Sequence, residues 1–211
     1  MRMRKKKYLT ERLAEVADYL YISQSEDRNF NTAINDKDYL DLEAWFGADR
    51  PLYLEIGCGK GKFAVEYAKR HPEINLLAVE REANVVVLAC EAAKKEGVKN
   101  LRFLKCSAEY LERHLKEHTV ERIFLNFSDP WSKKGYAKRR LTHRRYLAVY
   151  FNLLKDGGVL RFKTDNVGLF DFTLAEIEAL GLTPEVVTRD LHHSPYAEDN
   201  VMTEYERNFS S

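Results

Sequence analysis

Short apolar runs alternate with helix-like patterns between residues 50 and 180. A short apolar run predicts a buried strand, whereas apolar residues spaced three or four positions apart predict a helix. The predicted strands cover 52–56, 74–79, 101–105, 122–127 and 159–164. The predicted helices cover the stretch around 63–68, then 82–96, the stretch from Ser107 to 115, 142–154, and a last stretch ending at residue 180. Strands separated by helices of this length require a parallel sheet with right-handed crossovers.

The two ends of the chain carry weaker patterns. Residues 10–21 have a weak helical pattern, and Asp36 is a candidate cap for a helix that ends at Phe46. The segments 185–190 and 202–209 are rich in β-forming residues. We therefore expect a basic N-terminal extension over 1–35 and a single domain over 36–211. The expected fold class is α/β, with a mostly parallel seven-stranded sheet flanked by helices and an antiparallel C-terminal strand.

The most informative turn follows the first apolar run, in Leu-Tyr-Leu-Glu-Ile-Gly-Cys-Gly-Lys-Gly at 52–61. Strand, glycine turn and helix form the start of a nucleotide-binding unit, because glycine lets the backbone approach a ligand closely. A dinucleotide fingerprint needs a third glycine where Lys62 stands. Glu55 would repel a pyrophosphate and suits a cationic ligand such as S-adenosylmethionine. The stretch resembles motif I of the class I methyltransferases, and the alternative is a plain tight turn.

Composition narrows the class of protein. The chain has 211 residues, 45% hydrophobic and 32% charged, and no apolar run near the roughly 20 residues that span a bilayer. No apolar segment follows the basic N-terminus, so we expect no secretory signal. Three cysteines without C-x-x-C spacing indicate reduced thiols in a cytoplasmic protein and argue against zinc. The net charge of +1 means that a nucleic-acid surface must be a local patch.

Polar residues, mostly acids, stand at the ends of the predicted strands. In an open α/β sheet a ligand lies at the carboxyl ends of the strands. The residues at those ends are Glu55, Glu80, Ser107, Asp129 and Asp165. Glu80 lies 21 residues past Gly59, where an acid binds ribose hydroxyls, although an acid at a helix N-terminus is also favoured by the helix dipole. Ser107 is expected near an adenine base, or alternatively as a helix cap.

A distinctive loop, Asn-Phe-Ser-Asp-Pro-Trp-Ser-Lys-Lys at 126–134, follows the fourth predicted strand. Pro130 keeps Asp129 out of a helical conformation and stiffens the loop, and Trp131 offers an aromatic face beside the carboxylate. This is where class I methyltransferases place their catalytic loop. The alternative is an Asx-type turn with a core tryptophan.

A basic segment comes next, and no acid occurs from 130 to 155. Its basic residues are Lys133, Lys134, Lys138, Arg139, Arg140, Arg144 and Arg145. Such a run is often only a solvated surface, but this one adjoins the expected site, so we predict contact with phosphates. Residues 1–12, also rich in Arg and Lys, are either a solvated tail or a second arm that contacts phosphates.

Together these motifs resemble those of the bacterial tRNA (guanine-N7-)-methyltransferases over about residues 40–211. The matching stretches are the glycine turn, the loop at 126–134, the Lys-Arg-Arg run, Phe-Lys-Thr-Asp at 162–165 and Thr-Glu-Tyr-Glu at 203–206. The resemblance implies a Rossmann-like class I methyltransferase fold. Some relatives have an acid where Ser107 stands here.

The resemblance also implies roles for individual residues. The cofactor contacts would be Glu55, Gly57, Gly59, Glu80, Ser107 and Asp129. Asp129 would also be the catalytic residue. The substrate contacts would be Lys133, Asp165, Thr203, Glu204, Tyr205 and Glu206. The RNA-contacting residues would be Gly135, Tyr136, Ala137, Lys138, Arg139 and Arg140.

The reaction implied is methyl transfer from S-adenosylmethionine to N7 of a guanine in the variable loop of tRNA, without metal or membrane. Guanine N7 has an in-plane lone pair and needs no general base, so alignment and charge stabilisation are the enzyme's tasks. Asp129 would stabilise the positive charge on the purine, and Asp165 and Glu206 would share in reading its edge. The sequence does not decide between a monomer and a homodimer.

Three alternatives remain open. One is methylation of an exocyclic amine of a nucleobase or of a protein side chain, because the loop is similar to Asp/Asn-Pro-Pro-aromatic loops; its single proline argues against this. Another is an RNA-binding module with a vestigial cofactor site, which the set of Glu55, Glu80 and Asp129 disfavours. A nicotinamide-dependent oxidoreductase is disfavoured by Lys62. The pair His192–His193 lacks a spaced third ligand for a metal.

Overall fold

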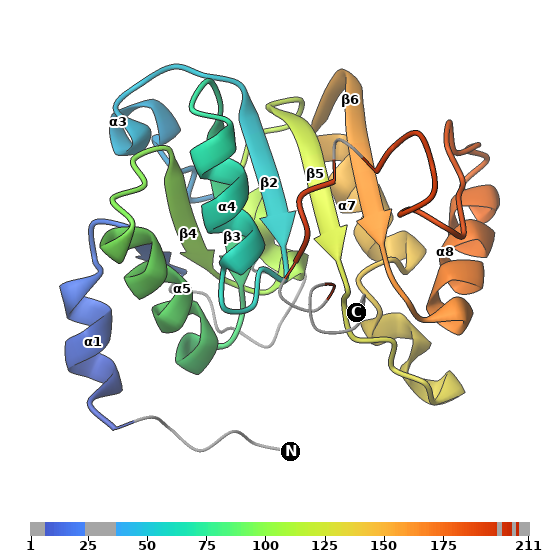
Figure 1. Cartoon of the computed structure of the whole chain (residues 1–211), viewed down its shortest axis with the longest axis horizontal. Helices are drawn as coiled ribbons and strands as arrows, with labels where there is room; N and C mark the ends of the chain where they lie inside the picture. The colour runs from blue at the N-terminus through green and yellow to red at the C-terminus, as the bar shows by residue number, and fades with distance from the viewer. Residues whose placement is uncertain (1–6, 24–36, 198–199, 204–205, 207–211) are drawn as a thin grey trace.

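The protein is described by a computed structural model over residues 7–23, 37–197, 200–203 and 206. Within these residues six strands form one sheet in the order β1-β4-β3-β2-β5-β6, and every neighbouring pair is parallel (Figure 1). The strands are β1 (Leu20–Ile22), β2 (Leu52–Ile56), β3 (Asn75–Glu80), β4 (Leu101–Lys105), β5 (Val120–Asn126) and β6 (Leu154–Lys163). All six therefore end at the same edge of the sheet, where the arrowheads lie in Figure 1.

Strand order reverses beside β2. This strand pairs with β3 on one side, Leu54 opposite Leu77, and with β5 on the other, Leu54 opposite Ile123. From β2 the chain builds β3 and β4 in one direction, then returns to build β5 and β6 in the other. A crevice at the carboxyl ends of the strands is expected at such a reversal.

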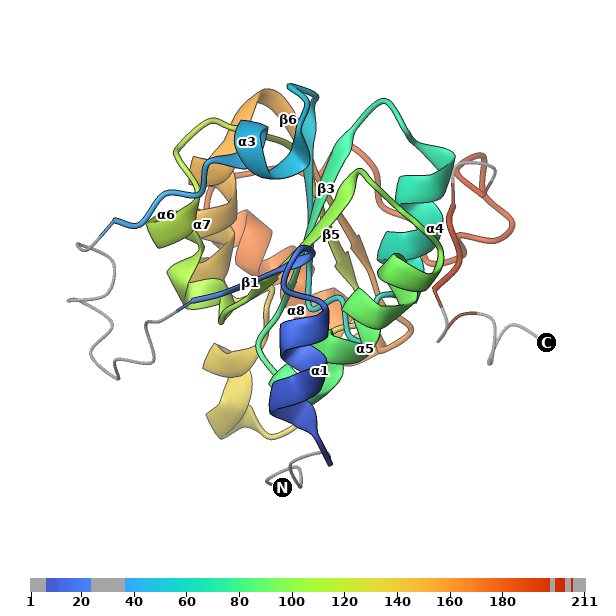
Figure 2. The same ribbon diagram turned by 90° about the vertical axis from the view of Figure 1, so that its left-hand side faces the viewer.

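Helices cover both faces of the sheet (Figures 1 and 2). One face carries α1 (Leu9–Glu15), α4 (Lys62–Arg70) and α5 (Ala83–Lys95), and the other carries α3 (Leu42–Phe46), α6 (Leu111–His114), α7 (Arg144–Leu153) and α8 (Val167–Ala179). Along β3, Leu76 and Ala78 enter the first core while Leu77 and Val79 enter the second. Burial of both sides explains why the central strands read as continuous apolar runs.

Five predicted strands are confirmed as β2 to β6, but the seven-stranded sheet with an antiparallel C-terminal strand is not. Residues 185–190 contain no strand, and Val186 and Val187 are about half exposed, at 48% and 51%. The segment 202–209 lies largely outside the described residues. The sixth strand is instead β1, which overlaps the end of the stretch 10–21 that the sequence indicated as weakly helical, and it pairs with β4.

The segment before β2 also differs from the sequence-based prediction in the length of its helix. Helix α3 is short and begins after Asp41, whose side chain accepts a hydrogen bond from the Ala44 N–H. The predicted cap Asp36 lies outside the described residues, as does the expected domain boundary at residue 35. Among the described residues no helix combines the length and apolar character needed to cross a membrane.

The turn after β2 is built on left-handed glycines. Gly57, Gly59 and Gly61 have φ of +79°, +57° and +76°, a region that other residues adopt at a cost. At Gly61 a second demand applies, because a Cβ there would lie 2.6 Å from the Ala89 Cβ on α5. The close approach of the start of α4 to α5 therefore requires glycine.

We predict that Gly61→Ala lowers the free energy of unfolding by about 2–5 kcal/mol, since backbone strain and overpacking add. The matched control is Gly97→Ala, which has a similar φ of +64° but open space around its Cβ position. The control should lose only about 1–2 kcal/mol, from strain alone. Urea unfolding of both variants measures this, and equal losses would show that the α4–α5 contact does not matter.

Candidate active site

A cavity of about 210 Å³ opens at the carboxyl ends of the central strands. Its wall is formed by the residues that follow β2, β3, β4 and β5, together with side chains from η2 (Lys134–Arg139) and the start of α7. The lining residues are Ile56, Gly57, Val79, Glu80, Arg81, Cys106, Ser107, Ala108, Phe127, Ser128, Asp129, Trp131, Arg139, Leu141 and Tyr146. The structure therefore brings Gly57, Glu80, Ser107 and Asp129 together around one cavity, whereas Glu55 and Gly59 of the predicted cofactor set are not among its lining residues.

Glu80 at the end of β3 is oriented by two main-chain donors. Its Oε2 accepts from the Gly59 N–H at 3.2 Å and its Oε1 from the Glu82 N–H at 2.9 Å. Burial raises the pKa of Glu80, and these hydrogen bonds oppose the rise. Each carboxylate oxygen keeps a second lone pair for a ligand.

Glu55 in β2 is buried, only 2% exposed, and is not among the residues that line the cavity. Asn126 at the end of β5 donates to its Oε1 at 3.1 Å, and Oε2 has no hydrogen-bond partner among the described residues. Burial raises the pKa of Glu55 to about 7, against the hydrogen bond from Asn126 and the positive charge of Lys163. A buried carboxylate oxygen without a donor is costly unless a ligand supplies one.

Ser107 follows β4 and precedes the short helix η1 (Ala108–Tyr110). Its side chain makes no capping hydrogen bond. It lines the cavity instead, between Cys106 and Ala108. The alternative that Ser107 serves only as a cap is therefore not supported by the geometry.

The loop after β5 is held in an unusual conformation. Phe127 and Trp131 have φ of +48° and +42°, which non-glycine residues rarely adopt. Asp129 is exposed, and the buried Ser128 Oγ has no partner among the described residues. Trp131 is only half-buried and lines the cavity, so it is not a core residue. Strain of this kind concentrates at functional sites.

Some residues of the basic segment pair with acids or carbonyls of the protein, whereas others extend toward solvent. Lys133, Lys134, Lys138 and Arg139 are exposed, and the Arg139 guanidinium lies over the Trp131 and Tyr136 rings. Three other arginines have partners within the protein, although Arg144 and Arg145 are themselves exposed. Arg140 donates to the carbonyls of the Asp129 loop, Arg144 pairs with Glu176 at 2.9 Å, and Arg145 pairs with Glu109 at 2.8 Å. Nothing in the sequence distinguishes the basic residues that have internal partners from the others.

The C-terminal segment packs through a buried network. Glu206 Oε2 accepts from the Thr203 N–H, and Thr203 Oγ1 accepts from the Glu206 N–H, which is the reciprocal pattern of a capping box. Lys163 at the end of β6 donates to Glu206, Asn200 and the Val201 carbonyl. Sequence reasoning did not single out Lys163, although a lysine that ends a strand was a usable signal.

Two further residues expected to contact the substrate lie outside the lining of the cavity. Asp165 and Lys133 are exposed, beyond the ends of β6 and β5 respectively, and neither lines the cavity as described. Glu204 and Tyr205 lie outside the described residues. No group of three potential metal ligands occurs in the described part of the chain, and His193 is engaged by Asp190 at 2.9 Å.

The parallel sheet with its order reversal, glycine turn and acidic loop after β5 is the class I methyltransferase fold. A family model described as "Putative methyltransferase" matches residues 49–211. The tRNA (guanine-N(7)-)-methyltransferase of Brevibacillus brevis is 46% identical over 166 residues, 79% of this chain and 78% of that protein. The protein of the same name in Geobacillus sp. is 40% identical over 211 residues, 100% of this chain and 90% of that protein.

Among solved structures, an rRNA methylase from Streptococcus thermophilus covers 75% of this chain and 80% of its own, with 14% identity and a TM-score of 0.48. The sequence relationships are much closer. The chain belongs to the tRNA (guanine-N(7)-)-methyltransferase family.

We predict a pH-dependent stability difference between the wild type and Glu55→Gln. The pKa of Glu55 is about 7 in the folded protein against an ordinary 4.5, so the folded state holds this proton more tightly than the unfolded state. Stability conferred by the neutral form is therefore lost as pH rises from about 4.5 to 7. The glutamine side chain of the variant stays neutral, so the variant should be more stable than the wild type above pH 7, by up to about 3 kcal/mol.

Melting temperatures of the two proteins between about pH 4.5 and 8.5 test this. The difference should vanish at the acidic end. A difference that does not change with pH would show that folding does not raise the pKa of Glu55.

Proposed function

We propose that this protein transfers the methyl group of S-adenosylmethionine to N7 of a guanine in the variable loop of tRNA. The observation that carries the proposal is the convergence of Glu80, Ser107 and Asp129 on one cavity, in a chain of this family. The relatives' names supply the nucleobase and the RNA class. The geometry supports a site for a cationic nucleoside beside an exposed carboxylate.

The residues present fit S-adenosylmethionine. Glu80 is held by two main-chain donors in a fixed orientation suited to ribose hydroxyls, and Ser107 lies where the base would stack beside Ala108. Glu55 Oε2 is a buried acceptor without a donor among the described residues, as expected near an ammonium or sulfonium charge. When bound, the cofactor supplies an electrophilic methyl group on a positively charged sulfur.

Asp129 has the position needed for catalysis. It follows the Phe127 turn, lines the cavity and faces solvent, so a guanine entering from outside meets it first. Attack by N7 moves positive charge onto the purine, and a carboxylate placed in advance stabilises that charge without reorganising. It also accepts hydrogen bonds from the guanine N1–H and exocyclic amine. Asp165 is exposed beyond the end of β6, and the Glu206 carboxylate is bound by Lys163, Asn200 and the Thr203 N–H.

The RNA surface we assign comprises Lys133, Lys134, Lys138 and Arg139. These side chains are exposed along η2 and lie beside the loop that carries Asp129. Extrusion of a base from a folded RNA costs a few kcal/mol. Phosphate contacts along this surface offset that cost.

The test of the function uses purified protein, methyl-labelled S-adenosylmethionine and unmodified tRNA transcripts, with nucleosides analysed by mass spectrometry. Label in N7-methylguanosine is the expected product. Label on an exocyclic amine would instead identify an amino methyltransferase. Cofactor binding without labelled RNA would point to a binding module.

We predict that Asp129→Asn lowers kcat by about 10²-fold, the usual effect of removing one stabilising group from a transition state. The matched control is Ser132→Ala, an exposed position of the same loop, which should keep near wild-type kcat. Single-turnover methylation at saturating tRNA measures the chemical step. Full activity of Asp129→Asn would remove Asp129 from the mechanism.

A further inference from the structure

The loop that carries Asp129 needs an external restraint. Phe127 and Trp131 both have left-handed φ, and such a conformation persists in non-glycine residues only where the surroundings enforce it. At Phe127 the restraint is the hydrogen bond from its N–H to the Lys163 carbonyl, 2.9 Å long. At Trp131 a different group must supply it.

Arg140 supplies the restraint at Trp131. Its Nε donates to the Pro130 carbonyl at 2.9 Å, and its Nη2 donates to the Trp131 carbonyl at 3.2 Å. These two carbonyls flank the Trp131 Cα, so one planar guanidinium binds both peptide groups around the strained residue. The fixed fork of donors in arginine suits this geometry, whereas the ammonium of lysine does not.

The guanidinium of Arg140 also rests on α8. It lies 4.3 Å from the centroid of the Phe172 ring, which places it between the loop and the helix, and the side chain is half-buried. A guanidinium over an aromatic face is stabilised by the charge distribution of the ring. Arg140 thus connects the loop that carries Asp129 to α8, a helix that follows the basic segment in the chain.

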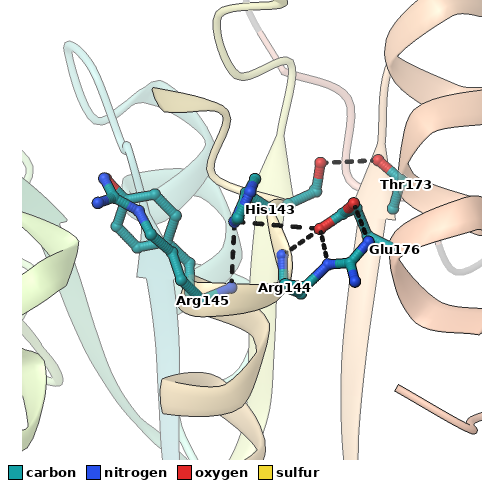
Figure 3. A network of polar contacts seen from close by, with 7 residues as sticks. His143, Arg144, Arg145, Thr173 and Glu176 are labelled. Carbon is teal, nitrogen blue, oxygen red and sulfur yellow. Dashed lines mark hydrogen bonds and ion pairs between the residues drawn. The ribbon is translucent and has the colours of Figure 1, made fainter. Parts of the chain in front are cut away.

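That helix is itself fixed to the start of α7 (Figure 3). Glu176 accepts from the Arg144 N–H at 2.6 Å and from its Nε and Nη2 at 3.0 and 2.9 Å. One helical turn earlier, Thr173 Oγ1 lies 2.8 Å from Thr142 Oγ1. Glu176 and Thr173 are buried, so the helix on which Arg140 rests is anchored to residues 142–144 at two points.

The neighbouring Arg139 has the opposite orientation. It is exposed and lines the cavity. Its guanidinium lies 5.1 Å from the centroid of the Trp131 ring and 4.7 Å from the centroid of the Tyr136 ring. Two adjacent arginines therefore bind the two sides of Trp131, one its ring and the other its backbone. Arg139 is exposed and Arg140 is half-buried, so Arg139 is the residue that we expect to contact a phosphate.

We propose that Arg140 is a positioning residue, which holds residues 130–131 in the conformation that presents Asp129 to the cavity, and that it is not an RNA contact. The part of this proposal that concerns methyl transfer rests on the proposed function. The part that concerns the loop geometry does not.

The kinetic test compares Arg140→Lys, Arg140→Ala and Arg139→Ala in methylation of a tRNA transcript. Both Arg140 variants should lose about 10- to 100-fold in kcat, the range for misplacement of a catalytic group by about 1 Å. Their slope of log Kd for tRNA against log salt should match the wild type. Arg139→Ala should reduce that slope by about 0.7–0.9, one phosphate contact.

Arg140→Lys decides between the two roles, because a phosphate contact survives the change to lysine and a bidentate backbone contact does not. Wild-type kcat in Arg140→Lys, or a reduced salt slope in Arg140→Ala, would overturn the proposal. A second pair of variants tests the support from α8. Phe172→Ala should lower kcat, whereas Phe170→Ala, which removes a similar ring under Arg189 on the same helix, should not.

A readout independent of methylation separates this proposal from the proposed function. The chain has two tryptophans, so Trp45→Phe leaves Trp131 as the only one. In that background Arg140→Lys should raise the acrylamide quenching constant of Trp131 while far-UV circular dichroism stays unchanged. Unchanged quenching would overturn the positioning role even if the enzyme methylates tRNA, and increased quenching would support it even if it does not.

Discussion

Three main-chain donors tie the glycine turn after β2 to the end of β3, and the remainder of the site depends on this connection. The N–H groups of Gly57 and Cys58 both donate to the Val79 carbonyl, and the Gly59 N–H donates to Glu80. The turn achieves this only with left-handed glycines, and Gly61 lets α4 begin against α5. Because β2 is also the strand beside which strand order reverses, this turn, the end of β3 and the loop after β5 meet at one cavity.

The acidic and the basic side chains near that cavity differ in how deeply they are buried. Burial raises the pKa values of the acids Glu55 and Glu80, and the hydrogen bonds that their carboxylates accept oppose the rise. The cations of the η2 side are exposed, which suits contact with phosphates. Between them, Arg140, Arg144 and Arg145 have internal partners and stabilise the framework. A chain with a net charge of +1 thereby presents exposed cations beside a cavity that Glu80 and Asp129 line.

Much of the fold was predictable from the sequence because the central strands are buried on both faces and read as unbroken apolar runs. The edges of the sheet were not. β1 has only three residues in a segment whose apolar spacing also fits a helix, and 185–190 has β-forming residues but no strand. At the site, the residues that follow the strands were predictable, since topology brings strand ends together. The different roles of Arg139 and Arg140 were not, because adjacent residues of identical chemistry differ only in orientation. Thr203 and Glu206 likewise match a substrate motif in sequence and form a capping box in space.

The central claim is that one crevice at the strand-order reversal holds both the methyl donor and the carboxylate that meets the acceptor base. A crystal structure with S-adenosylhomocysteine tests it most directly. The account predicts the ribose hydroxyls on Glu80, the base beside Ser107 and the sulfur on the side of the cavity lined by Asp129. Density for the nucleoside at any other face, or a sulfur directed away from Asp129, would contradict it.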